Sequence, residues 1–168
     1  MTVAAAAEKH NISKATAYRY FSDPVLLVAE AGLDISVATY DAIVADIPGV
    51  REKLKAISLY FFDLAIDNEA GFRQFVGMTL AAWKPDGTQS PARRGARRIL
   101  MYERAFASED LVPTEQEQKK LIHALATATG AEAMIALLDV ANLDHAAARE
   151  TVSEIADALL DRYLGREN

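Results

Sequence analysis

The spacing of the apolar residues constrains the fold of this chain more than any other feature. Between Val50 and Leu64, the apolar residues Val50, Leu54, Ile57, Phe61 and Leu64 follow one another in steps of four, three, four and three. These steps place them on one face of a helix. No segment shows the strict alternation of apolar and polar residues that is typical of a half-buried strand. The sequence therefore predicts an all-α fold of about eight helices.

Local start and stop signals predict where the helices lie. Thr114 and Glu117 have the spacing of a capping box, Asp144 can cap the last helix, and Pro24 suits a first helical position. The sequence KPDGTQSP is the clearest loop. We expect helices over residues 2–9, 14–20, 24–47, from 50 onward, 69–84, 91–108, 115–140 and 145–164.

Composition limits the class of protein. The chain has no cysteine, which excludes disulfides and thiolate metal sites and favours a reducing compartment. Its apolar runs are short for a membrane span, and its N-terminus lacks the plan of a signal peptide. We therefore expect a cytoplasmic protein with no membrane partner. The net charge of −6 argues against general affinity for nucleic acid, yet residues 1–23 carry +1.

Residues 10–27, HNISKATAYRYFSDPVLL, read as the second half of a helix-turn-helix. A short helix over 14–20 would be the recognition helix, whose N-terminal residues reach base edges in the major groove. Its residue types suit contacts with phosphates and bases: Lys14, Ala15, Thr16, Tyr18, Arg19 and Tyr20. The alternative is that Tyr18 and Phe21 are core aromatics and that the charges form a solvated face.

Residues 2–31, TVAAAAEKHNISKATAYRYFSDPVLLVAEA, resemble the DNA-binding region of TetR-family transcriptional regulators. The residues in register with the family pattern are Thr2, Ala7, Ile12, Ser13, Lys14, Thr16, Tyr18, Arg19, Phe21, Leu27 and Ala29. The resemblance implies that residues 1–30 form a DNA-binding region and residues 31–168 a helical ligand-binding and dimerisation domain. It also implies that Lys14, Ala15, Thr16, Tyr18 and Tyr20 face DNA.

Two departures from the family pattern affect this expectation. Pro24 stands where the family usually has a lysine that assists phosphate binding. The family also has a further helix before the position of Thr2, which covers the apolar faces of the next two. We expect a start codon assigned too late, a fragment, or a real loss of that helix, and favour the first two.

The resemblance further implies an inducer pocket in the larger domain. Aromatic and sulfur-containing side chains could line it, with a few polar contacts: Phe61, Phe72, Phe75, Met78, Trp83, Tyr102, His123 and Thr127. The alternative is that most of these residues are ordinary core. The three histidines share no ligand spacing, so we expect neither a metal nor a cofactor.

The last two predicted helices combine small and apolar residues that would allow close packing. A two-fold interface through Met134, Leu138, Ile155, Leu159 and Tyr163 explains the pattern, and so does a hairpin within one chain. The resemblance favours a homodimer, which a two-fold DNA operator would mirror.

Four arginines at positions 93, 94, 97 and 98 form the densest positive charge in the chain. They are either a second surface for nucleic acid or an acidic ligand, or a solvated face that pairs with nearby acids.

The sequence thus predicts a ligand-responsive, DNA-binding transcriptional regulator, most simply a repressor released by a small molecule. The alternative is a dimeric helical ligand-binding module that has lost DNA binding. We expect no enzyme, because the sequence has no nucleophile elbow, Gly-rich phosphate loop or pair of carboxylates with a cleft.

Overall fold

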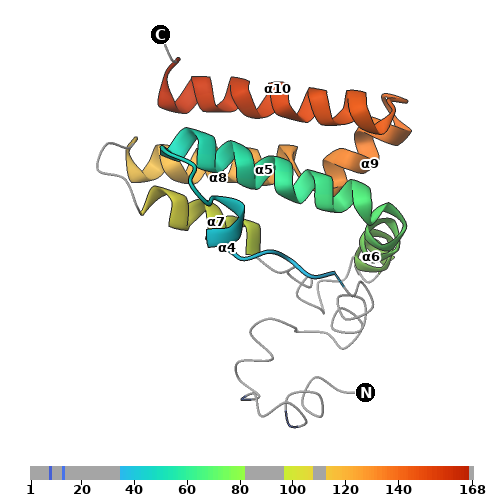
Figure 1. The fold of residues 1–168 in the computed structure, drawn as a ribbon. Helices are drawn as coiled ribbons and strands as arrows, with labels where there is room; N and C mark the ends of the chain where they lie inside the picture. Colours follow the sequence, from blue (N-terminus) through green and yellow to red (C-terminus); the bar gives the residue numbers. More distant parts are fainter. Residues whose placement is uncertain (1–7, 9–12, 14–34, 82–96, 108–112, 167–168) are drawn as a thin grey trace, which may run out of the picture. The chain divides into compact units, whose positions relative to one another are not determined.

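The computed structural model describes residues 8, 13, 35–81, 97–107 and 113–166 (Figure 1). These residues form seven α-helices and no strand, which confirms the all-α prediction for the described part of the chain. The helices are α4 (Tyr40–Ile43), α5 (Val50–Asp67), α6 (Glu69–Ala81), α7 (Arg97–Phe106), α8 (Glu115–Ala128), α9 (Ala131–Asp139) and α10 (His145–Leu164). The predicted helices over 2–9 and 14–20 fall almost wholly outside the described residues.

The chain divides into two compact units. One comprises Val37–Glu69 and Ala96–Asn168, and the other comprises Met1–Ser36 and Ala70–Gly95. Nearly all of α6 lies in the second unit. There Val76 is buried, and the Thr79 hydroxyl donates a hydrogen bond to the Val76 carbonyl. The other six helices belong to the first unit.

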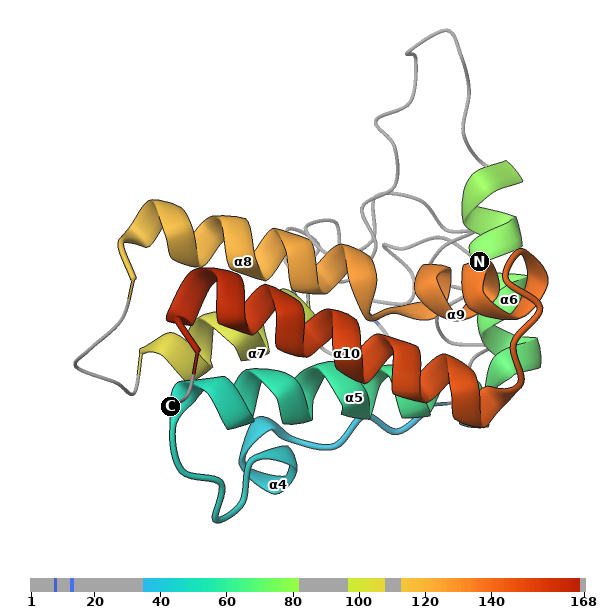
Figure 2. The same ribbon diagram turned by 90° about the horizontal axis from the view of Figure 1, so that it is seen from above.

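In the first unit α5 is the central helix. It contacts α4, α7, α9 and α10, while α10 also contacts α8 and α9. Figure 1 shows α10 above α5 and α8, with α7 below them, and in Figure 2 α10 runs between α5 and α8. The main core contains Val44, Leu54, Ile57, Tyr102, Ala105, Phe106, Leu121, Ile122, Leu125, Ala156 and Leu160.

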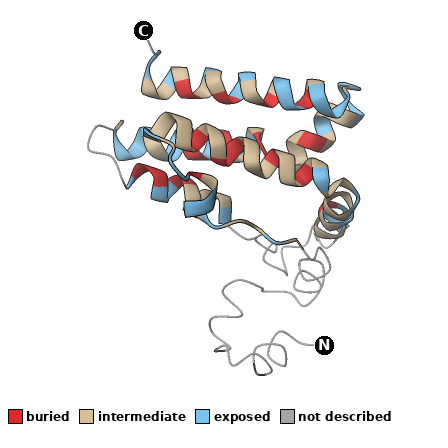
Figure 3. Ribbon diagram, in the orientation of Figure 1, coloured by how far each residue is buried: buried red, intermediate tan, exposed pale blue. Residues whose placement is uncertain are grey.

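The buried face of α5 is broader than the predicted stripe. Leu54 and Ile57 are fully buried as expected, whereas Phe61 and Leu64 are only half-buried. Because α5 has neighbours on several sides, it also buries Ser58, Phe62 and Ala65. On α10 the buried residues are Ala148, Val152, Ala156 and Leu160, at steps of four, and they form the stripe seen in Figure 3.

The predicted caps of α8 and α10 are confirmed. The Glu117 side chain accepts a hydrogen bond from the Thr114 N–H at 3.0 Å, and the Thr114 hydroxyl accepts one from the Glu117 N–H. The Asp144 carboxylate accepts from the Ala147 N–H at 2.8 Å. Helix α10 ends at Leu164, and Gly165 follows with a φ of 85°, a conformation that favours glycine.

The prediction of one helix over 115–140 is wrong. The helix stops after Ala128, and α9 begins at Ala131 with its axis bent by 46° from that of α8. Gly130 has an extended backbone, and the Thr129 hydroxyl bonds back to the Leu125 carbonyl at 2.7 Å. A glycine interior to a helix is unfavourable, so the sequence itself favours a break in the helix at Gly130.

The prediction of a continuous helix to residue 47 is also wrong. Residues 35–39 are not helical, and Thr39 caps the four-residue helix α4. Ile35, Val37 and Thr39 are β-branched, which lowers their helix propensity. The Ala38 N–H instead donates a hydrogen bond to the Tyr60 hydroxyl at 2.7 Å.

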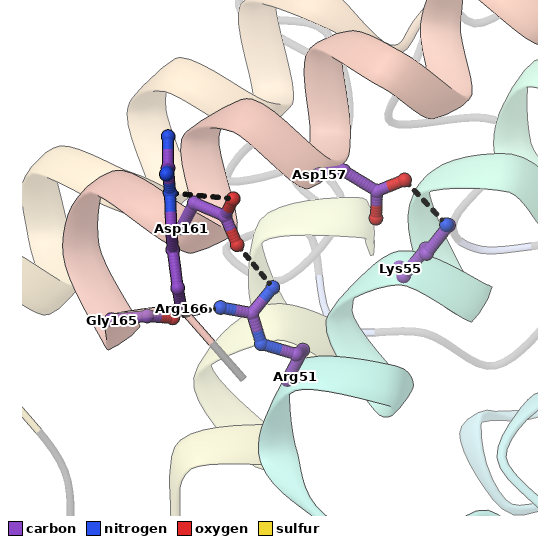
Figure 4. Close-up of polar contacts among 6 residues, drawn as sticks. All are labelled: Arg51, Lys55, Asp157, Asp161, Gly165 and Arg166. Carbon is purple, nitrogen blue, oxygen red and sulfur yellow. Dashed lines mark hydrogen bonds and ion pairs between the residues drawn. The ribbon is translucent and has the colours of Figure 1, made fainter. Parts of the chain in front are cut away.

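Ion pairs join α5 to α10 (Figure 4). Arg51 pairs with Asp161 at 3.0 Å, Lys55 with Asp157 at 2.7 Å, and Asp63 with Arg149 at 2.7 Å. In each pair the two residue numbers add to 212, so the two helices run antiparallel in one register. The third pair has its charges reversed relative to the first two. We call this set the α5–α10 ladder.

Among the described residues, no individual helix combines the length and the apolar character that crossing a membrane requires. Helices α8 and α9 reach that length and composition only when they are taken together as a bent pair.

Candidate functional site

Helix α7 carries a polar group into the core of the first unit. Tyr102 is fully buried, and its hydroxyl lies 2.9 Å from the Ser58 hydroxyl of α5 and 3.2 Å from the Thr129 hydroxyl at the α8–α9 bend. Ser58 and Thr129 are also fully buried. Each reaches the carbonyl four residues before it, Leu54 at 2.8 Å and Leu125 at 2.7 Å. We call Ser58, Tyr102 and Thr129 the hydroxyl cluster.

Burial is the largest influence on the phenol of Tyr102, and it raises the pKa of this group above the ordinary value. The hydrogen bonds from Ser58 and Thr129 and the nearby charge of Arg98 act in the opposite direction but do not prevail. Tyr102 is therefore a neutral hydrogen-bonding group at physiological pH. Its chemistry suits holding three elements together rather than transferring protons.

Arg98, also on α7, makes further contacts with α5 and with the end of α8. Its Nη2 donates a hydrogen bond to the Ala126 carbonyl at 2.7 Å, and its guanidinium lies 5.9 Å from the centroid of the Phe61 ring. The guanidinium also lies directly against Gly130, where a Cβ would overlap its Nη1. The absence of a side chain at position 130 thus gives this arginine room.

The described residues of the first unit form surface hollows, of which two are considered next. The α7 hollow, of about 440 Å³, is lined by Val37, Ala38, Tyr40, Arg97, Leu100, Met101 and Arg104. The α9–α10 hollow, of about 610 Å³, is lined by Glu69, Leu138, Leu143, Asp144, His145 and Ala146. In the second hollow, His145 Nε2 lies 3.0 Å from a Glu69 carboxylate oxygen.

The predicted pocket residues of the first unit are placed differently from one another. Tyr102 belongs to the main core, and Phe61 packs against that core. His123 and Thr127 are exposed on α8, where the Thr127 hydroxyl donates to the His123 carbonyl at 2.8 Å. None of these four residues lines either hollow.

The other predicted pocket residues lie elsewhere. Phe72, Phe75 and Met78 are half-buried on α6, within the second unit. Trp83 lies outside the described residues. A shared pocket for the eight residues stays a prediction.

The six predicted DNA-contacting residues, which run from Lys14 to Tyr20, all lie outside the described residues. No contact, exposure or orientation is assigned to them, and the helix-turn-helix stays a prediction.

The predicted interface residues occupy several environments. Met134 is fully buried within the chain itself, while Leu159 and Tyr163 pack partly against the main core. Leu138 lines the α9–α10 hollow. Ile155 is 36% exposed, which makes it the most accessible of the five residues predicted for the dimer interface.

Several residues that shape this region were missed by the sequence reasoning. Ser58 and Thr129 carried no signal as buried hydrogen-bonding groups, since both also suit a solvated helix face. Arg98 was grouped with its neighbours as surface charge. Gly130 was the one available signal, because a glycine inside a predicted helix often has a packing reason.

Among residues 35–81, 97–107 and 113–166, no group of three or more His, Cys, Asp or Glu side chains could hold a metal ion. No protein-family model, no curated protein and no solved structure matches the chain.

Proposed function

We propose that the chain is a ligand-responsive, DNA-binding regulator of transcription, acting in the cytoplasm as a homodimeric repressor. The run SKATAYRYF, with its cap and its resemblance to the TetR recognition helix, carries this proposal. The all-α fold of the described residues is compatible with it. Lys14 and Arg19 would neutralise phosphates, and Thr16 would read a base pair.

Regulation in this proposal is a shift between two populations of the dimer. In one population the recognition helices match two half-sites of the operator, and in the other they do not. A small molecule releases DNA only if it binds the second population more tightly. The partners are therefore an operator duplex, an inducer and a second copy of the chain.

The test is binding of the full-length gene product to the DNA that flanks its own gene, measured across a salt series. A sequence preference over unrelated DNA of equal length is expected at each salt concentration, while total affinity falls as salt rises. Binding that never distinguishes the two duplexes would contradict the proposal.

Two substitutions test the recognition helix itself. Tyr18→Phe should weaken binding to every sequence, because it removes a backbone contact. Thr16→Ala should change the preference at particular base pairs by roughly 1–3 kcal/mol. If both variants bind as the parent does, the recognition helix has been assigned to the wrong residues.

A second candidate function is a dimeric helical ligand-binding module without DNA binding. It is favoured by the separate core of the first unit and by the net charge of −7 outside residues 1–23. Amide exchange separates the two candidates. Fast exchange over residues 1–30, beside slow exchange in α5 and α10, supports the module.

A further inference from the structure

The exposed side of α10 carries a row of charges that is acidic in one half and basic in the other. Residues four apart are neighbours on the surface of a helix. Every member of the row is exposed, and the members are Glu150, Glu154, Ala158, Arg162 and Arg166. Figure 3 shows that exposed stretches recur along α10. Two glutamates therefore lie on one side of the small Ala158, and two arginines lie on the other side. We call this set the α10 charge row.

Most charges of the row have no ion pair within the chain. Glu150, Glu154 and Arg162 form no ion pair with another of the described residues. Arg166 differs from them, because its Nε lies 3.7 Å from a carboxylate oxygen of Asp161. The charges of Glu154 and Arg162, on either side of the centre, are thus available to a partner outside the chain.

The contacts that Arg162 does make are weak. Its guanidinium lies 5.9 Å from the centroid of the neighbouring Tyr163 ring. On α8, the pKa of Glu117 is lowered mainly by the hydrogen bonds from Thr114 and least by the charge of Arg162. Neither contact neutralises the guanidinium.

The order of the charges is unfavourable within a single helix. Like charges four residues apart repel, and the row places Glu150 beside Glu154 and Arg162 beside Arg166. The dipole of the helix favours Arg162 in the last turn, but the first turn of α10, all of it described, holds no acidic residue. A solvated face would gain more from glutamates and arginines that alternate at this spacing.

We propose that α10 pairs with α10 of a second copy of this chain, antiparallel, about a two-fold axis beside Ala158. Glu154 then faces Arg162 of the partner subunit, and Arg162 faces Glu154 of the partner subunit. This reciprocity is what a two-fold interface requires. It follows from the sequence itself, because positions 154 and 162 lie equally far from position 158.

The helix geometry allows both charge pairs to form. Packing of the rows of residues four apart, one helix against the other, is the commonest arrangement of two helices and crosses them at about 50°. A small residue at the crossing, Ala158, lets the two axes approach closely. Glu154 and Arg162 each lie about 6 Å along the axis from that point, within reach of the partner helix.

The apolar part of this surface is Ile155. It is 36% exposed and lies three residues before Ala158, which places the two side by side on the helix. A second copy would remove this apolar area from water. The charges contribute little affinity but determine the orientation, because a parallel pairing would set like charges opposite each other. A single helix crossing buries less than the roughly 1,600 Å² of a standard interface, so we expect a weak dimer.

As the interface of a homodimeric repressor, this pairing rests on the function proposed above, whereas the association itself does not. It keeps Ile155 from the predicted interface. It excludes Met134, which is fully buried within its own chain.

The test is sedimentation equilibrium of the full chain and of two charge-reversal variants over a range of protein concentrations. In Glu154→Arg, each contact sets two arginines opposite each other, and in Arg162→Glu it sets two glutamates. Each variant alone should self-associate roughly tenfold or more weakly than the parent. An equimolar mixture of the two variants should regain the parent's association, because every arginine then faces a glutamate.

Two further variants act as controls. Glu103→Arg changes the net charge by the same amount at an exposed position on α7, and it should self-associate as the parent does. Ala158→Lys places two lysines at the crossing and should abolish the association. Circular dichroism checks that each variant folds. A monomeric parent, an equal loss in Glu103→Arg, or a mixture that stays as weak as its components would overturn the proposal.

The DNA assay separates this inference from the proposed function. A chain that dimerises through this row but never prefers its operator retains the interface and loses the regulator. A chain that binds its operator as a dimer, while Glu154→Arg and Arg162→Glu associate as the parent does, retains the function and loses this interface.

Discussion

Helix α5 is joined to its two main neighbours by opposite kinds of polar contact. On the α7 side the contact is the hydroxyl cluster, made of neutral groups with no exposed surface. On the α10 side it is the α5–α10 ladder, made of full charges whose side chains are 15–50% exposed. The buried residues of α10 are small or apolar, Ala148 and Ala156 among them.

The difference shows where a polar contact matters for stability. Water competes for the charges of the ladder, so each pair contributes little but determines direction and register. Water does not reach the hydroxyl cluster, so its contacts are stronger, and a partner left alone there carries the full cost of burial.

The largest effect is expected for Tyr102→Ala. The substitution removes a fully buried aromatic ring and leaves a cavity among α5, α7 and α8, which costs ~3–5 kcal/mol of unfolding free energy. Urea denaturation followed by circular dichroism measures it. Tyr163→Ala is the control, because Tyr163 is only half-buried on α10. Equal losses of unfolding free energy in the two variants would show that the contacts between α5 and α7 contribute no more to stability than those of α10.

The second largest effect is expected when the hydrogen bonds of the Tyr102 hydroxyl are removed from one side or the other. Tyr102→Phe leaves both hydroxyls with their own helix carbonyls, so it should cost only ~0.5–1.5 kcal/mol. The double variant Ser58→Ala/Thr129→Val leaves the buried Tyr102 hydroxyl without a hydrogen-bond partner and should lower the free energy of unfolding by ~1–3 kcal/mol.

The two single variants complete a double-mutant cycle in urea. Ser58→Ala or Thr129→Val alone should reduce the free energy of unfolding by less than half as much as the double variant. The reason is that the Tyr102 hydroxyl keeps one hydrogen-bond partner in each single variant and loses both in the double variant. Strict additivity would mean that the three hydroxyls do not act together.

Charge reversal in the ladder should have a smaller effect. Asp157→Lys places two lysines opposite each other and should destabilise the fold by up to ~1 kcal/mol. Adding Lys55→Asp should restore stability, because the reversed pair keeps the same register. Thermal unfolding in low and high salt measures both. A loss that salt does not reduce would contradict a screened surface pair.

The smallest effect is expected at the N-terminal cap of α8. Its two residues, Thr114 and Glu117, are exposed and lie only three positions apart in the sequence. Hydrogen bonds from the Thr114 hydroxyl and then the Thr114 N–H hold the pKa of Glu117 below its ordinary value. The Glu117 carboxylate therefore stabilises the fold at pH values above its ordinary, unfolded pKa. This contribution is lost as the pH falls through the lower pKa that Glu117 has in the folded protein.

Carboxyl NMR titration reports the pKa shift, and Glu117→Gln should flatten the acid side of the stability profile slightly. Glu103→Gln, at an exposed position on α7, is the comparison and should leave the profile unchanged. A profile that responds equally to both would show that the cap has no effect of its own.

Local signals made much of the fold predictable. The capping box at Thr114, the cap at Asp144 and the end of the last helix at residue 164 each depend on a few neighbouring residues, and each was confirmed. The bend at Gly130 and the non-helical segment before α4 were missed. Besides their local causes, both places have contacts with residues distant in sequence, Arg98 against Gly130 and Tyr60 with Ala38.

The candidate site was less predictable for the same reason. A helical pattern shows that α7 has two faces, but not that Tyr102 meets two hydroxyls while Arg104 meets Asp41 and Tyr40. The family resemblance concerned residues 2–31, most of which lie outside the described residues. Its consequences for DNA binding stay predictions.

The hydroxyl cluster has a consequence for protons. Ser58, Tyr102 and Thr129 supply three hydroxyl hydrogens, while four oxygen–oxygen contacts run from the Leu54 carbonyl to the Leu125 carbonyl. One contact must therefore lack a hydrogen at every instant. Rotation of the hydroxyls moves that gap along the row without moving a heavy atom. While Ser58 and Thr129 donate to their own helix carbonyls, the Tyr102 hydroxyl can donate to only one of them at a time, either toward α5 or toward the bend.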